Sequence, residues 1–160
     1  MTRTRSILTA SILAAAIAGP AAAAAGVRGL TAEQDCYDAL VWASAVRQTP
    51  TPVPECDDGC IVISWPWLVD LDIARVIKGR VQPGRLLVIR LQHSYSHPRR
   101  HRWWLRRNSL GAFNVLLGDH RLPRCAPGVA PASPYVSPPK GKTLRDMARE
   151  AEARHLKEAR

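Results

Sequence analysis

An alternating run of apolar side chains limits the folds open to this chain more than any other feature of its sequence. Every second residue from Trp67 to Ile73 is large and apolar, and Asp70 and Asp72 stand between them. A period of two is that of a half-buried β-strand, because successive side chains point to opposite faces. Pro66 is then expected at a bulge, at the strand start or on an edge. Both aspartates are expected to face solvent, opposite the apolar set.

Four further segments have the composition of strands. Residues 39–47 also fit a helical stripe, but valine and tryptophan favour a strand there. Residues 85–92 are the clearest apolar strand, and Pro83–Gly84 before them fits a type II turn. The last two are residues 100–107 and 112–117. Five short strands joined by turns predict a mainly β fold, a small and mostly antiparallel OB-like barrel.

The composition changes after this region. Residues 122–139 hold six prolines, which predicts an extended, proline-rich tail or strap over residues 123–142. Residues 143–160 then have the pattern of a C-terminal helix, with Thr143 and Asp146 in the capping-box positions. We expect Glu150 and Arg154 to form an i,i+4 pair and the helix to dock loosely, because its apolar face is weak. That face comprises Leu144, Met147, Ala148, Ala151 and His155.

Residues 1–25 have the layout of a secretory signal peptide. Arg3 and Arg5 supply the positive start, residues 6–18 form an apolar stretch, and small residues up to Ala25 suit cleavage. The stretch is shorter than the roughly 20 apolar residues that span a bilayer. We therefore expect cleavage, no transmembrane helix in the mature chain, and a periplasmic or secreted protein. Residues 26–122 would form the barrel domain.

All four cysteines lie in the expected exported part, which predicts two disulfides, because oxidising compartments favour pairing. Four cysteines allow three pairings, and spacing alone leaves the choice open. Cys56 and Cys60 flank a tight Asp-Gly turn in "CDDGC", where a disulfide would fix the turn. Cys36 and Cys125 would then tie the two ends of the barrel together. Redox, zinc and calcium roles fit the loop less well, because three residues separate its cysteines and it has few carboxylates.

The charge balance points to an anionic partner. The chain has 23 Lys and Arg against 13 Asp and Glu, a formal net charge of +10, and loss of Arg3 and Arg5 with the signal peptide would leave +8. Between Arg75 and Gly118 the sequence has ten basic residues and no carboxylate. Such a field attracts anionic headgroups, polymers or acidic proteins. A solvated basic face without a partner is the alternative.

The densest part of this region interleaves arginine with tryptophan. Arginine binds phosphate and carboxylate through two nitrogens and stacks on aromatic rings. Trp103 and Trp104 would face opposite sides of a strand, so one of them is expected in the core. The candidate anion-binding residues are Arg99, Arg100, Arg102, Trp103, Trp104, Arg106 and Arg107.

Three histidines recur every four residues. On a strand, His93, His97 and His101 would stand about 13 Å apart, and Pro98 disfavours a helix. They can therefore hold one metal ion only if the chain folds back, so no metal or cofactor is expected, with a metal-binding periplasmic protein as the alternative.

The sequence has no G-x-S-x-G, H-E-x-x-H or phosphate loop. A non-enzymatic protein is expected, and a hydrolase of unrecognised type is a further alternative.

Parts of the chain resemble known barrels. "ALVWASAVRQ", "WLVDLDIARVIKG" and "PGRLLVIRL" resemble the first three strands of netrin-like and tissue-inhibitor-of-metalloproteinase domains. The resemblance implies an OB-type barrel. It does not imply inhibition, because those inhibitors present an N-terminal cysteine to zinc, and Cys36 would lie inside the mature chain. The exported part also resembles uncharacterised small exported bacterial proteins near "LRRNSLGAFNVL" and in its Cys-Pro-Gly-type tail, which implies no activity.

These features together predict an exported binding or accessory protein without enzymatic activity. Its basic Arg/Trp surface would meet an anionic component of the cell envelope or an acidic protein. Nucleic acid is not expected as the partner of an exported chain.

Overall fold

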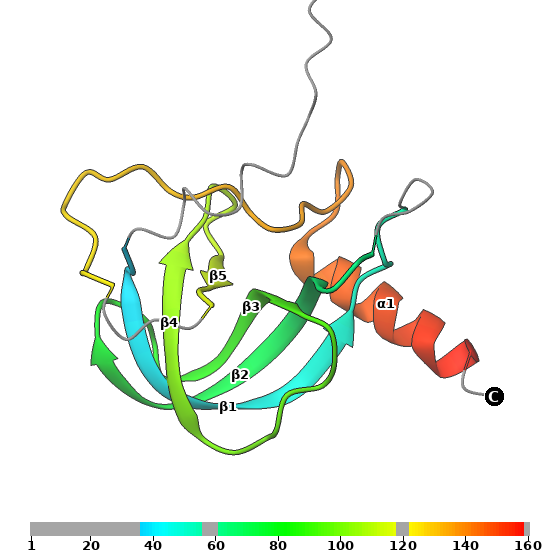
Figure 1. The fold of residues 1–160 in the computed structure, drawn as a ribbon, viewed down its shortest axis with the longest axis horizontal. Coiled ribbons are helices and arrows are strands. Elements are labelled where there is room, and N and C mark those ends of the chain that lie inside the picture. Colours follow the sequence, from blue (N-terminus) through cyan, green and yellow to red (C-terminus); the bar gives the residue numbers. More distant parts are fainter. Residues whose placement is uncertain (1–35, 56–60, 118–121, 159–160) are drawn as a thin grey trace, which may run out of the picture.

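The computed structural model describes residues 36–55, 61–117 and 122–158. Five strands form a closed barrel in the order β1-β2-β3-β5-β4, and one helix follows them (Figure 1). All neighbouring strands are antiparallel except β3 and β5, which are parallel. The predicted class, a small and mostly antiparallel β-barrel with a C-terminal helix, is confirmed. The elements are β1 (Ala39–Pro50), β2 (Trp65–Lys78), β3 (Gly84–Gln92), β4 (His101–Arg107), β5 (Phe113–Val115) and α1 (Leu144–Glu158).

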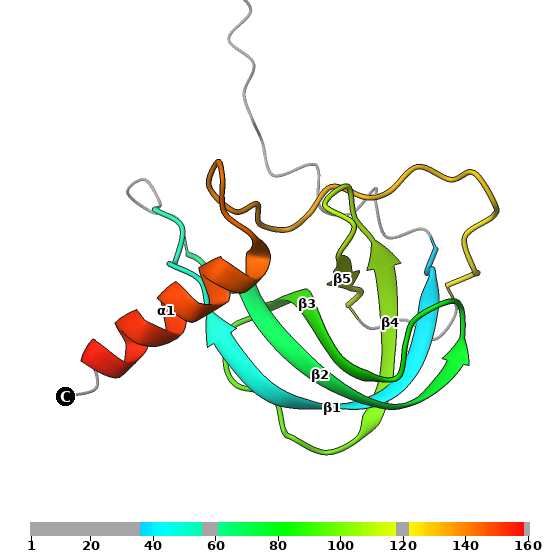
Figure 2. The same ribbon diagram turned by 180° about the vertical axis from the view of Figure 1, so that it is seen from behind.

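The alternating segment forms β2, and its apolar side chains fill the barrel. Trp67, Val69, Leu71 and Ile73 are at most 3% exposed and pack against inward residues of the other four strands. Pro66 lies at the start of the strand, as expected. Figures 1 and 2 show β1 and β2 as long curved strands that sweep along the barrel. The register shifts in β1 provide the curvature that one strand needs to pair with both β2 and β4.

One glycine is required where β2 ends beside the start of β1. Gly79 has φ +91°, and a Cβ there would lie 2.3 Å from the carbonyl oxygen of Asp38. Only glycine fits both the left-handed backbone and this close approach. The turn that follows contains Gly84 with φ +100°, which suits the third position of the predicted type II turn.

The proline-rich segment is a strap attached to the barrel at several points. The disulfide Cys36–Cys125 confirms one of the predicted pairings. Beside it, the Tyr37 amide donates to the Pro123 carbonyl, and the Cys125 amide donates to the Tyr37 carbonyl. A cross-link over 89 residues stabilises by about 4–5 kcal/mol in the chain-entropy model. The predicted Cys56–Cys60 link and the signal peptide lie outside the described residues.

Further along, the strap is held by two buried asparagines. The Asn114 side-chain amide donates to the Ser133 carbonyl at 2.7 Å, and Asn108 donates to Asn114 at 3.0 Å. Both asparagines are 1% exposed, so these hydrogen bonds satisfy amides that would otherwise be buried without partners. Both views show the strap arching over one end of the barrel on its way to α1 (Figures 1 and 2).

The helix begins with the predicted capping box. The Thr143 amide donates to Asp146 at 2.9 Å, and the Asp146 amide donates to the Thr143 hydroxyl at 3.1 Å. α1 packs on β1 through Ala151, which is 3% exposed, and Arg47 of β1 pairs with Glu152 at 3.1 Å. Glu150 pairs with Lys142 (2.7 Å) instead of the predicted Arg154, because the bend before the helix brings the lysine back over its first turns. Within the described ranges, no helix is long and apolar enough to cross a membrane.

Candidate anion-binding pocket in the barrel wall

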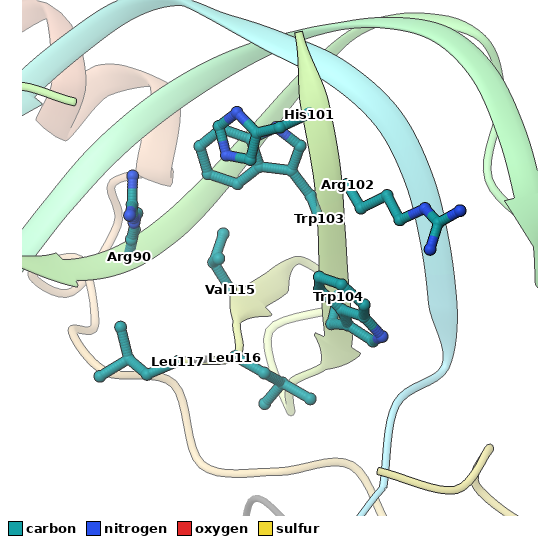
Figure 3. A pocket seen from close by; sticks show the side chains of 8 residues that line it. All are labelled: Arg90, His101, Arg102, Trp103, Trp104, Val115, Leu116 and Leu117. Carbon is teal, nitrogen blue, oxygen red and sulfur yellow. The ribbon is translucent and has the colours of Figure 1, made fainter. Parts of the chain in front are cut away.

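The shortness of β5 leaves an opening in the barrel wall. β5 pairs with β3 only at Val88 and Ile89 and with β4 only from Leu105 onward. β3 runs on to Gln92 and β4 starts at His101, and these two ends do not pair with each other. A pocket of about 400 Å³ lies between them (Figure 3).

The pocket has apolar walls and several basic side chains. Among the residues that the structure describes, no aspartate or glutamate lines it. Figure 3 shows Arg90 on one side, the His101 and Trp103 rings together, and the two leucines that follow β5 at the base. The lining residues are Arg90, His101, Arg102, Trp103, Trp104, Val115, Leu116 and Leu117.

Arg90 is the most unusual of these residues. Val88, Arg90 and Gln92 alternate along β3 toward the barrel interior, and the Arg90 guanidinium lies 5.0 Å from the centre of the Trp103 ring. Its Nη1 donates to the Ser96 hydroxyl at 2.7 Å, whereas its buried Nε has no hydrogen-bond partner in the described part of the chain. Burial lowers the pKa of Arg90, yet a guanidinium stays charged at neutral pH.

A fixed aromatic face supports this cation. The indole nitrogen of Trp103 donates to the Ala43 carbonyl at 3.0 Å, and the side chain is 2% exposed. The His101 ring stacks on Trp103 with centroids 4.3 Å apart. His101 Nδ1 lies 3.0 Å from the Arg99 carbonyl oxygen and must be the donor there, since a carbonyl only accepts.

The loop between β3 and β4 closes this end of the barrel and positions Arg90. The Ser96 amide donates to the Gln48 side chain at 2.8 Å, and Gln48 donates back to the Ser96 carbonyl at 2.8 Å. Tyr95 packs edge-on against Trp67 at 4.9 Å. Because Ser96 also accepts from Arg90, the loop holds the guanidinium in place before any ligand arrives.

The structure divides the predicted arginine and tryptophan residues into three groups. Arg102, Trp103 and Trp104 line the wall pocket, and only Trp103 is in the core, as the alternation predicts. Arg99 and Arg100 are exposed before β4, where Arg100 lies 3.7 Å from Asp72.

The last two arginines of β4 lie away from this pocket. Arg106 is buried and bonded to Asp38 (2.7 Å) and to the Ala130 carbonyl (2.5 Å), so it holds the fold together instead of forming part of a binding surface. Arg107 lies over Phe113 at the other end of the strand, with its guanidinium 5.0 Å from the ring centre.

The side chains of Asp70 and Asp72 differ in solvent exposure, although their alternation predicts that both face solvent. The Asp72 side chain is 39% exposed, but that of Asp70 is only 15% exposed and lies 3.9 Å from Arg47. Arg47 is the partner of Asp70 in the register between β1 and β2, and its side chain covers Asp70 in part.

The three histidines are not assembled into a site. His93 and His97 are exposed, His101 is stacked on Trp103, and no group of three His, Cys, Asp or Glu side chains within the described residues could hold a metal ion.

Comparison with known proteins finds no matching family, no matching curated protein and no matching solved structure. The resemblance to netrin-like barrels stays a prediction, and the pocket is interpreted from its own chemistry.

Proposed function

We propose that this chain is an exported, non-enzymatic binding module that holds an anion with an apolar body in the wall pocket. The observation that carries the proposal is Arg90, a desolvated cation whose buried Nε has no hydrogen-bond partner and which forms no ion pair with any carboxylate among the described residues. An unsatisfied buried donor costs about 1–3 kcal/mol. An anionic group entering the opening would supply the acceptor and the counter-charge together.

The walls indicate the rest of the ligand. A pocket of about 400 Å³ falls in the range of small-molecule sites, roughly 300–1,000 Å³. Trp104, Val115 and Leu117 offer apolar contacts, so a carboxylate with an aliphatic or aromatic tail fits better than a free inorganic ion. An anionic component of the envelope has this chemistry. Export is supported by the signal-like N-terminus and by the Cys36–Cys125 disulfide.

Three probes with the same ten-carbon tail and different charges test this proposal: decanoate, decanol and decyltrimethylammonium. Tryptophan fluorescence reports their binding beside Trp103 and Trp104. We expect decanoate to bind at least about tenfold more tightly than decanol, the range for a hydrogen bond to a charged group. The Arg90→Met variant should lose this preference and keep the apolar contact.

Arg85→Met is the matched control, because Arg85 is exposed on the same strand and does not line the pocket. It should bind decanoate as the unmodified chain does. Equal affinity for decanoate and decanol, or equal weakening in both variants, would contradict the proposal.

A further inference from the structure

A second pocket lies at the other end of the barrel and differs in chemistry. Its volume is about 550 Å³, and it is lined by the turn after β2, the end of β4 and the strap from Arg124 to Val129. β4 begins at the wall pocket with His101 and ends here with Arg107. The two pockets are therefore separate sites on one barrel.

Three arginines from three separate segments line this second pocket: Arg80, Arg107 and Arg124. The carboxylate that lines it, Asp38, is already engaged, because its Oδ2 accepts from Arg106 Nη1 and from the Arg107 amide, both at 2.7 Å. None of the three lining guanidinium groups has an ion-pair partner within the described chain. The pocket thus keeps three uncompensated positive charges.

The covalent cross-link shapes this pocket. Cys125 lines it, and the neighbouring Arg124 pairs with Tyr37 in a backbone bridge next to the Cys36–Cys125 disulfide. Arg107 is positioned by its contact with Phe113, at 5.0 Å from the ring centre. The disulfide-linked strap therefore positions Arg124, and the core positions Arg107, before a ligand binds.

We infer that this second pocket binds a phosphate-type oxyanion that carries more than one negative charge. Three arginines that line one pocket can match the several oxygens of a phosphoryl group, which arginine contacts in a forked geometry. The inference goes beyond the proposed function, because it concerns other residues and a different class of ligand. Because the strap carries Arg124, the site also depends on the disulfide.

Inorganic pyrophosphate, titrated calorimetrically into the oxidised full chain, is the first probe. We expect Arg80→Gln and Arg124→Gln each to weaken binding by about tenfold or more. Arg145→Gln removes the same charge from an exposed position on α1 and should change affinity less than twofold. The double substitution of Cys36 and Cys125 by serine should weaken binding as much as Arg124→Gln does. Arg124→Gln keeps the disulfide, so it tests the site even if the serine variant fails to fold.

Sedimentation with vesicles distinguishes a lipid phosphate from a free one. If vesicles that contain phosphatidic acid, a phosphomonoester, retain the chain, phosphatidylcholine vesicles do not, and Arg124→Gln abolishes retention, the headgroup is the ligand. If pyrophosphate binds without vesicle retention, the ligand is a free oxyanion. Absence of binding in both arms, or equal weakening by Arg145→Gln, would overturn the inference. None of these results affects the proposal for the wall pocket, because that proposal depends on Arg90.

Discussion

Two arginines with buried side-chain atoms, Arg90 and Arg106, show how a single partner changes the role of a buried charge. Arg106 meets Asp38 at 2.7 Å and the Ala130 carbonyl, so it links β4 to the chain before β1 and to the strap. Arg90 contacts the Ser96 hydroxyl and the Trp103 ring, and no carboxylate in the described ranges pairs with it. A charge that is paired in the fold stabilises the structure, whereas one that is left unpaired in a pocket is available to a ligand.

The Arg106–Asp38 pair gives a prediction for single residues. Asp38→Asn keeps the shape of the side chain but leaves the Arg106 guanidinium buried without a counter-charge. We expect the free energy of unfolding to fall by up to about 3–5 kcal/mol, the range for breaking a buried pair, as measured by urea denaturation. Asp72→Asn should change it by less than about 1 kcal/mol, because the Asp72–Arg100 pair is partly exposed. Equal effects of the two substitutions would contradict this account.

At the scale of elements, the strands were predictable because their side chains alternate. The period of two in residues 67–73 reflects burial in the barrel, and the turn residues around it mark where strands end. The wall opening was not predictable, because it depends on β5 stopping at Val115 while β3 and β4 extend further. Arg90 was missed as a site residue, although its alternation with Val88 was a signal that it faces inward.

The start of α1 gives a prediction about pH. Hydrogen bonds from the Thr143 hydroxyl and amide, together with Arg149, lower the pKa of Asp146 to about 2, from 3.8. A carboxyl group with a lowered folded-state pKa stabilises the helix above pH 4, and this contribution is lost as the pH falls toward 2. Helical ellipticity at 222 nm should therefore decline between pH 4 and pH 2. In Asp146→Asn the signal should be lower at pH 7 and change less over this range; an identical decline in both proteins would refute the capping role.

At the scale of the whole molecule, long-range contacts connect sequence features that local patterns leave separate. The Cys36–Cys125 link belongs to the pairing that the Asp-Gly turn favoured among three, and the backbone bridge between Tyr37 and Arg124 brings the two cysteines together. The Gln48–Ser96 hydrogen bonds join β1 to the loop before β4, and no local pattern in the sequence indicates them. The barrel thereby places an apolar basic pocket and a more polar arginine pocket at opposite ends of β4.

An anion with an apolar tail should enter the wall opening beside Arg90. The most direct test follows the indole N–H resonances of the ¹⁵N-labelled chain during titration with decanoate. We predict that the Trp103 and Trp104 resonances of the unmodified chain move at decanoate concentrations at least about tenfold lower than those needed in Arg90→Met. The resonance of Trp65, whose indole nitrogen donates to the Thr51 carbonyl outside this pocket, should stay in place. Unchanged Trp103 and Trp104 resonances, or equal shifts at all tryptophans, would contradict the claim.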